Sequence, residues 1–374
     1  MRKHLFTTLL TPGVLMAILL LSACKEVKQH APQQEVCDFQ FSETVTSDSL
    51  VERINYFSLG HSDGKTLGRP GKISRCGDNI IIADYRYGII FAYDSESGEQ
   101  KFVIDSPGQG PGEYAELRSV ACDKDNIYVV DNSRAQLLCF SGDNGAYLWS
   151  RPMPIVADDM ETLDNGGFIF ASSLGKNVKT SIPQERARLF VTDGDLNVTA
   201  TYYPYADGEY DVIGQKYYLT KNQGKILFGS VMTDGFTEIN AEDVTDHRQF
   251  VFDFPNGLAA SGCDDAHEVN KYQHLSVPPF VVGDNYMISY VTGAGTMNYN
   301  LWNSDSKLFY NNPKTDISKA IMPVIGALDD KFVAYIDDYN MYQGGVKHGF
   351  TAASAEIEQH LKNDGAVLVF YTMK

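Results

Sequence analysis

A stretch of this chain repeats itself without a gap. Residues 78–84 (DNIIIAD) return 47 positions later as residues 125–131 (DNIYVVD), and residues 90–93 (IFAY) return at the same offset as residues 137–140 (LLCF). A period of roughly 40 to 50 residues made of short strands is typical of the blade of a β-propeller, a unit that buries its faces only when stacked in a ring. The repeat therefore predicts a circular array of small sheets.

Strand patterns bounded by Gly, Asp and Asn continue down the chain, and helix-length periodic segments are nearly absent. This predicts an all-β protein. The first five blades are expected at 71–105, at 117–154, at 167–193 in a degenerate form with a polar insert, at 225–252 and at 286–310. Six blades is the predicted count, with seven as the alternative because the later repeats are faint.

The sixth blade needs both ends of the chain. Residues 331–336 and 366–371 are expected to supply its inner and middle strands, and residues 54–59 its outer strand. Pairing first and last segments in one sheet closes the ring and removes its free edges. Good helix formers at 351–361 predict one short surface helix, and residues 38–374 as a whole are expected to form a single β-propeller domain.

The N-terminus has the pattern of an export signal. Arg2 and Lys3 precede an apolar run, Val14–Leu21, that is far shorter than the ~20 residues of a spanning helix. The run ends in Leu-Ser-Ala-Cys24, which resembles the lipobox of bacterial lipoproteins; an ordinary secretory signal is the alternative. The resemblance implies removal of residues 1–23, a lipid on Cys24 and, from the lysine that follows it, the outer membrane, with the leaflet left open.

Residues 24–37 are polar and predict a flexible tether between the lipid and the fold. The formal charge of −17, which becomes about −19 when the two cationic residues of the signal are lost, repels nucleic acid and anionic headgroups, so membrane attachment is expected to come from the lipid alone. Five further cysteines show neither a disulfide framework nor zinc-ligand spacing, and their disulfide state is left open: Cys37, Cys76, Cys122, Cys139 and Cys263.

A Gly-rich segment, residues 108–114 (GQGPGEY), follows the first blade. A nucleotide-binding loop would be followed by a helix, whereas a strand pattern follows here, so the segment is predicted to connect two blades. Together with residues 125–131 and Arg134, it resembles NHL-repeat propellers. With the lipobox and the terminal strand 366–374, it is similar to the six-bladed β-propeller lipoproteins of Bacteroidetes, a resemblance that implies the fold and a cell-envelope location but no particular activity.

Asp84 and Asp131 close equivalent strands of the two clear blades and are predicted to cap turns by accepting backbone N–H bonds. Tyrosines gather in segments that look like loops, where exposed rings suit sugar stacking or peptide binding, although rings also fill the wedges between blades. The candidate ligand-binding residues are Arg86, Tyr87, Arg134, Tyr272, His274, Asp337 and Tyr339.

The catalytic inventory is thin, because the histidines are scattered and no serine-nucleophile or metalloprotease motif is present. The sequence therefore predicts a non-enzymatic, outer-membrane-anchored propeller that binds a glycan, a peptide or a protein partner through loops on one face. One alternative is a lyase, lactonase or glycan-cleaving propeller with a divalent metal in the central channel; another is a scaffold subunit of an envelope complex. No cofactor is predicted, with calcium at Asp337-Asp338 as the alternative.

Overall fold

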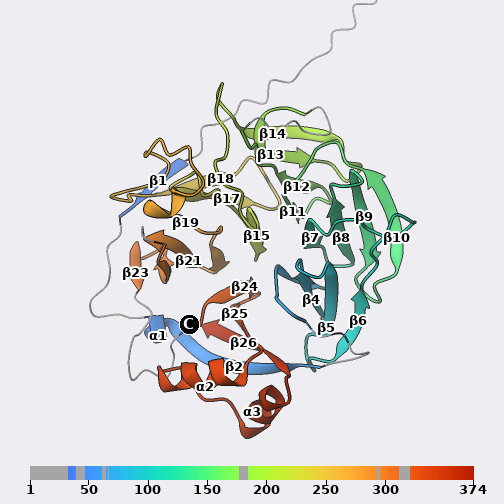
Figure 1. Cartoon of the computed structure of the whole chain (residues 1–374), viewed down its shortest axis with the longest axis vertical. Coiled ribbons are helices and arrows are strands. Elements are labelled where there is room, and N and C mark those ends of the chain that lie inside the picture. Colours follow the sequence, from blue (N-terminus) through green and yellow to red (C-terminus); the bar gives the residue numbers. More distant parts are fainter. Residues whose placement is uncertain are drawn as a thin grey trace, which may run out of the picture. The chain divides into compact units, whose positions relative to one another are not determined.

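The computed structural model describes residues 33–38, 47–60, 65, 67–176, 184–292, 295–310 and 321–374. All of them belong to one compact unit, Ala31–Lys374, in which six small sheets stand in a ring around a common centre (Figure 1). The innermost strands contact one another in sequence around the centre, and the last contacts the first. The predicted all-β, six-bladed propeller is confirmed.

Blades 1 to 3 are regular antiparallel sheets of four strands each. From the centre outward they comprise β3 Ile73–Cys76, β4 Asn79–Asp84, β5 Ile89–Asp94 and β6 Gln100–Ile104; β7 Ser119–Cys122, β8 Asn126–Asp131, β9 Gln136–Ser141 and β10 Tyr147–Pro152; and β11 Asp159–Thr162, β12 Phe168–Ala171, β13 Ala187–Thr192 and β14 Val198–Pro204.

Blades 4 and 5 carry additions to this plan. Blade 4 comprises β15 Leu219–Asn222, β16 Lys225–Phe228, β17 Gly235–Asn240 and β18 His247–Phe252, with β1 Gln33–Cys37 added outside β18. Blade 5 comprises β21 Asn285–Thr292, β22 Met297–Asn303 and β23 Leu308–Tyr310, while two short strands, β19 Gln273–Leu275 and β20 Phe280–Val282, share the inner edge of β21.

The sequence repeat corresponds to one structural register in two blades. In blade 1, Asn79 pairs with Asp94 and Asp84 with Ile89 across β4 and β5. In blade 2, β8 and β9 pair in the same way, 47 residues further along. The central strands β4 and β8 are almost fully buried on both faces because each blade packs against its neighbours. Their continuous apolar runs are therefore the sequence signature of stacking.

The ring closes as predicted, with one correction to the order of strands. β2 Val51–Leu59 pairs antiparallel with β26 Ala366–Met373 over its whole length, so the N-terminal segment forms the outer strand of blade 6. The prediction that residues 331–336 lie innermost was wrong, because β25 Lys331–Ile336 is second from the centre. The innermost strand is β24 Val324–Leu328, whose Gly326 lies too close to Ile73 of blade 1 to admit a side chain.

The end of the predicted tether belongs to the fold. β1 pairs in parallel with β18, from Gln33 opposite Arg248 to Cys37 opposite Phe252, and the Cys37 side chain is buried. Residues 33–37 were expected to be flexible and instead cover the outer edge of blade 4, which a sheet otherwise leaves with unpaired N–H and C=O groups. The rest of the predicted signal peptide and tether, Cys24 included, lies outside the described residues.

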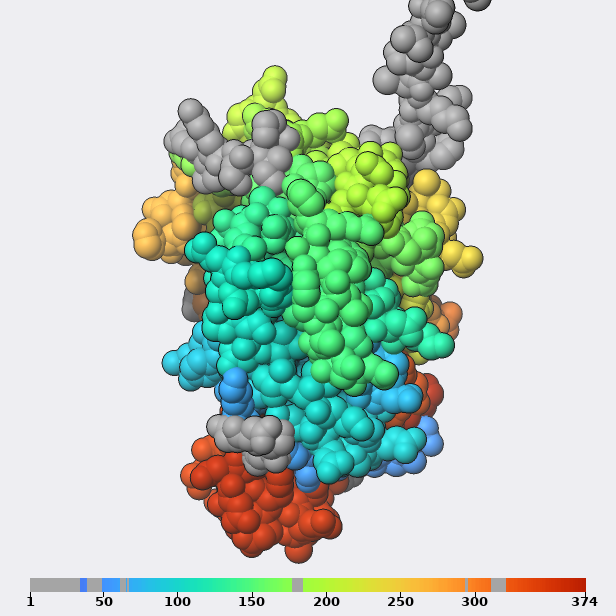
Figure 2. All heavy atoms as spheres, turned by 90° about the vertical axis from the view of Figure 1, so that its right-hand side faces the viewer, coloured from blue at the N-terminus to red at the C-terminus, as the bar shows by residue number. Residues whose placement is uncertain are grey.

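Helices flank blade 6. α3 Ala355–Lys362, capped by Ser354, confirms the predicted surface helix, but α2 Tyr339–Lys347 was not expected. Both lie in the long connection between β25 and β26, and α1 Ser47–Leu50 is a single turn before β2. Figure 2 views the rim from the side of blades 1 to 3 and shows α2 and α3 projecting at one end. Within the described residues, no helix combines the length and apolarity needed to cross a membrane.

Aromatic side chains fill the wedges between blades. Phe236, Phe250, Tyr286 and Trp302 from blades 4 and 5 form one cluster, with ring centroids 4.8–6.5 Å apart. Exposed loops and packing were both open roles for the tyrosines of loop-like segments, and several of them are buried, namely Tyr202, Tyr205, Tyr217, Tyr218 and Tyr342. The wedge between blades offers a large flat ring more apolar contact than an exposed loop would.

Candidate functional site

A polar pocket of about 700 Å³ opens at the centre of one face of the ring. Its walls come from the ends of the innermost strands of blades 1, 2, 3, 4 and 6 and from the turns that follow them, Gly77–Asp78, Asp123–Asp125 and Asp164–Gly166 among them. We call it the axial pocket. The turns between second and third strands, including Asp84 and Asp131, lie at the other end of the same strands and form the opposite face of the ring.

Below the axial pocket, the centre of the ring is closed by a buried lysine. Nζ of Lys72, which is 7% exposed, lies 3.0 Å from Oδ1 of Asp159 and 2.7 Å from Oε1 of Glu161, and it also donates to the Met160 carbonyl at 2.7 Å. Burial alone would lower the pKa of Lys72, but the two carboxylates outweigh that effect and raise it. The centre of the propeller therefore contains an internal cation.

Asp159 of blade 3 contacts three other blades, the first of them through Lys72 of blade 1. Its Oδ1 also accepts the hydroxyl of Ser119 from blade 2 at 2.7 Å, and its Oδ2 accepts the backbone N–H groups of Tyr218 and Leu219 from blade 4 at 2.8 and 2.7 Å. Lys72 precedes the first strand of blade 1, and Asp159 begins blade 3. A buried carboxylate saturated in this way fixes the relative positions of the inner strands.

Glu161, two residues further along β11, faces both the lysine and the pocket. It is 3% exposed and lines the axial pocket. Desolvation raises the pKa of Glu161, an effect that Lys72 and, more weakly, Lys221 oppose and Asp159 reinforces. Within the described residues, Lys72 is the one hydrogen-bonding partner of this side chain, through Oε1. The floor of the pocket thus carries a buried carboxylate with one oxygen left for a ligand.

The charges around the pocket mouth are mixed but predominantly acidic. Three cationic side chains face six carboxylates, and two of the cations are paired: Arg75 lies 2.8 Å from Asp329, and Lys221 lies 2.8 Å from Asp164. No aromatic residue belongs to the described lining. The pocket therefore suits a polar ligand held by hydrogen bonds and charge rather than by ring stacking.

Asp84 and Asp131 cap turns, as predicted. Asp84 accepts four backbone N–H groups at 2.9–3.2 Å, two from the preceding interblade connection and two from its own turn. Asp131 accepts two, one from each of the corresponding segments, at 2.8 and 3.1 Å. Both carboxylates are fully buried. Their shared role explains why the repeat retains them.

The Gly-rich segment connects blades 1 and 2 and satisfies its own polar groups. The Glu113 carboxylate accepts the N–H of Gly110 at 2.7 Å and lies where a side chain on Gly108 would have to be. Arg134 donates to the carbonyls of Gly110 and Glu113 at 3.3 and 2.6 Å, so this candidate ligand-binding residue holds the connection in place. Arg86 and Tyr87 are exposed nearby on the same face, with the guanidinium 5.5 Å from the ring centroid.

The remaining candidates do not converge with these residues. His274 is 4% exposed in β19, its Nδ1 lies 3.0 Å from the Tyr272 carbonyl, and burial lowers its pKa. Asp337 and Tyr339 flank Asp338, whose carboxylate accepts the N–H of Met341 at 2.6 Å and caps α2. None of the seven predicted ligand-binding residues lines the axial pocket.

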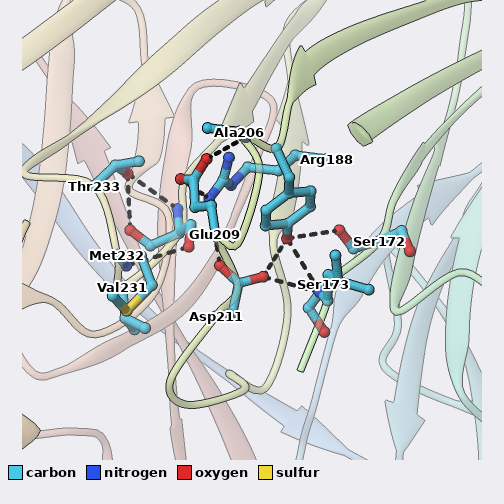
Figure 3. Close-up of polar contacts among 12 residues, drawn as sticks. Ser172, Ser173, Arg188, Ala206, Glu209, Asp211, Val231, Met232 and Thr233 are labelled. Atoms are coloured by element: carbon cyan, nitrogen blue, oxygen red, sulfur yellow. Dashed lines mark hydrogen bonds and ion pairs between the residues drawn. The ribbon is translucent and has the colours of Figure 1, made fainter. Parts of the chain in front are cut away.

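A second charged cluster lies in blade 3 at the face opposite the axial pocket, and Figure 3 shows its polar contacts. Arg188 of β13 lies 2.8 Å from the Glu209 carboxylate and 3.7 Å from that of Asp211, and its guanidinium stacks 3.9 Å from the Tyr205 ring centroid. The Tyr205 hydroxyl donates to Asp211. In Figure 3 both carboxylates turn toward the arginine, so its charge is already compensated and the cluster holds residues 205–211 against β13.

Sequence reasoning missed the residues at the axis. Neither Lys72 nor residues 159–162 (DMET) were singled out by any motif or repeat. The available clue was a pair of acidic residues at alternating positions in β11, because both point to the same side of a strand and a side this close to the centre is buried.

Comparisons with known proteins agree with the six-sheet ring. By its fold the chain is a six-bladed β-propeller, and a family described as 6-bladed beta-propeller, DUF5128, matches residues 25–275; the chain belongs to this family. A solved "Putative exported protein" from Bacteroides fragilis is 17% identical with a TM-score of 0.71, over 91% of this chain and 100% of that one. A DUF4221 member from Bacteroides vulgatus is 11% identical with a TM-score of 0.48, over 87% and 97%. No curated protein matches.

Proposed function

We propose that this chain is an outer-membrane lipoprotein, anchored through Cys24, whose propeller binds a peptide in the axial pocket. The anchor rests on the short apolar run that ends in Leu-Ser-Ala-Cys24 and on the polar residues after it. An envelope location is further supported by the fold likeness to a Bacteroides protein described as exported.

The axial pocket is the observation that carries the binding proposal. Its volume of about 700 Å³ lies within the ~300–1,000 Å³ of typical ligand sites. Five blades contribute to it, so the ring positions its polar groups rigidly. Because the described lining offers carboxylates, amides and hydroxyls but no aromatic ring, the pocket favours a peptide over a glycan, whose recognition commonly includes stacking on aromatic side chains.

The alternative of a metal-dependent propeller enzyme would place a divalent ion at the axis. There, the ammonium of Lys72 lies between the carboxylates of Asp159 and Glu161. Within the described residues, no three His, Cys, Asp or Glu side chains are grouped so as to hold a metal ion. This arrangement favours the binding proposal, and metal-dependent thermal shifts of the full chain would test the alternative.

Peptide and glycan arrays probed with the full chain in detergent test the binding proposal. Ser74 lines the pocket wall, so Ser74→Trp is expected to fill the pocket and abolish retained binding. Ser133→Trp is the matched control, because Ser133 is exposed in a turn on the opposite face. Peptide binding that survives Ser74→Trp and is lost in Ser133→Trp would place the site on the wrong face and overturn the proposal.

Metabolic labelling tests the anchor separately. Cells that express the full chain with an alkyne analogue of palmitate are expected to label the parent, and Cys24→Ala is expected to remove the label. Cys263→Ala is the control, since this cysteine lies in the propeller. Equal labelling of Cys24→Ala and the parent would refute lipidation at Cys24 without affecting the pocket.

A further inference from the structure

We propose that the ligand enters the axial pocket with a cationic group, an ammonium or a guanidinium, that pairs with the buried carboxylate of Glu161. This inference rests on the proposed function and names the chemistry of the group that the pocket selects. A lysine or arginine side chain of a peptide and a free polyamine share this chemistry.

Glu161 is built into the pocket floor with an unused oxygen. The carboxylate is 3% exposed, and Oε1 accepts the Lys72 ammonium at 2.7 Å. Among the described residues, no donor is bonded to its second oxygen, Oε2. A nearly buried carboxylate that faces a pocket with one oxygen free is a strong acceptor for an N⁺–H donor.

Asp159, the other carboxylate that pairs with Lys72, has no oxygen without a hydrogen-bond donor, unlike Glu161. Both oxygens of Asp159 are occupied: Oδ1 by Lys72 and the Ser119 hydroxyl, and Oδ2 by two backbone N–H groups of β15 and the residue before it. Lys72 is therefore shared between one saturated and one unsaturated carboxylate. A second cation at Glu161 would complete the pairing of the two acids.

The rest of the lining strengthens the preference for a cation. Arg75 pairs with Asp329, and Lys221 pairs with Asp164, although Lys221 also lies close enough to lower the pKa of Glu161. The carboxylates of Asp78 and Asp125 at the pocket mouth make no side-chain hydrogen bond within the described residues. Lys124 is the remaining cation of the described lining. Walls with an excess of one charge concentrate the field inside a cleft and attract the opposite charge.

Calorimetry with designed peptides tests this inference on the full chain in detergent, at about 0.15 M salt to screen the net charge. The probes are two heptapeptides that differ at the central residue, lysine or norleucine, and spermidine as a free polyamine. Removing one partner of a desolvated charge pair weakens binding strongly. The lysine peptide is therefore expected to bind the parent at least about tenfold more tightly than the norleucine peptide.

Variants separate the role of Glu161 from general electrostatics. Glu161→Gln is expected to erase the lysine preference, while Glu242→Gln, which removes the same charge from an exposed turn of blade 4, is expected to retain it. Asp125→Asn, at the pocket mouth, is expected to reduce the preference only about two- to threefold because this carboxylate is solvated. This variant keeps the test valid if Glu161→Gln does not fold.

Each outcome decides between the proposals. A lysine preference that survives in Glu161→Gln overturns the inference. Equal affinity for the two peptides, lost for both in Ser74→Trp, also overturns it but leaves peptide binding in the pocket intact. If neither peptide binds the parent and spermidine does so with the same dependence on Glu161, cation recognition stands and the peptide proposal fails. If no probe binds, both fail.

Discussion

Replacing Lys72 with methionine tests the account of the propeller axis most severely. The substitution retains most of the side-chain volume but removes the ammonium that lies 3.0 and 2.7 Å from the carboxylates of Asp159 and Glu161. At an effective dielectric constant of about 20, each contact contributes about 5–6 kcal/mol of Coulomb attraction. Most of this Coulomb attraction is offset by the desolvation of three charges, so the two ion pairs stabilise the fold only modestly. Removing the lysine is more costly, because it leaves two buried carboxylates without their cation.

Removing one partner of a buried pair typically costs about 3–5 kcal/mol, and we expect a loss in free energy of unfolding of this size at about pH 8. With a shift of about 2 °C per kcal/mol for a chain of this size, Tm is expected to fall by about 6–10 °C. The loss should be smaller at about pH 5, because the pKa of Glu161, already raised by burial, rises further without the ammonium, and a protonated carboxyl escapes the cost of a buried charge.

Urea unfolding at both pH values measures these losses, with Lys101→Met as the control because Lys101 is exposed on β6. The control is expected to change stability by less than about 0.5 kcal/mol. The double variant Lys72→Met/Glu161→Gln is expected to recover part of the loss, since it removes one of the two stranded charges. A Lys72→Met loss below about 1 kcal/mol at pH 8 would refute the reasoning.

Buried cysteines, a buried histidine and a buried aspartate give three more tests. Cys37 and Cys139 are buried, and burial raises the pKa of both thiols to about 12. Iodoacetamide is therefore expected to modify them only after unfolding, whereas it should modify the partly exposed Cys263 in the native protein. Mass spectrometry of the labelled protein measures both. Burial lowers the pKa of His274 below 6.5, so the unfolded chain binds more protons than the folded chain as the pH falls through about 6.5, and the free energy of unfolding decreases. In urea titrations, His274→Gln should therefore make this decrease toward acid pH smaller. Asp131→Ala leaves two backbone N–H groups without their acceptor and should cost about 1–3 kcal/mol in the same assay.

Each of these tests has a contradicting result. Native labelling of Cys139 as fast as that of Cys263 would mean that blade 2 opens readily. A pH profile unchanged by His274→Gln would show that this histidine is not buried in its neutral form. The control for the aspartate is Asp143→Ala, in an exposed turn of the same blade; equal losses in both variants would contradict the capping role.

The sequence was sufficient for architecture because the blade is a local unit. Residues 78–84 and 125–131 repeat the same strand and the same capping aspartate, and each part of that pattern forms within a few residues of itself. Ring closure was also predictable, because residues 54–59 and 366–371 are strand patterns near the two ends of the chain, and pairing them in one sheet leaves neither with a free edge.

The face that carries the axial pocket was not predictable for a physical reason. Lys72, Asp159 and Glu161 meet only because stacking brings blades 1 and 3 to a common centre, and no spacing in the chain encodes that meeting. α2 was missed because Gly344 and Gly345 each disfavour a helix by about 1 kcal/mol; its cap at Asp338 and the burial of Tyr342 offset this.

The central claim is that a ligand binds on the face of the axial pocket. Hydrogen–deuterium exchange of the full chain, with and without the tightest peptide from the arrays, tests it most directly. Binding is expected to slow exchange in the turns at Gly77–Asp78, Asp123–Asp125 and Asp164–Gly166 and to leave the turns around Arg86 and Arg134 unchanged. Protection confined to the turns around Arg86 and Arg134 would contradict the account.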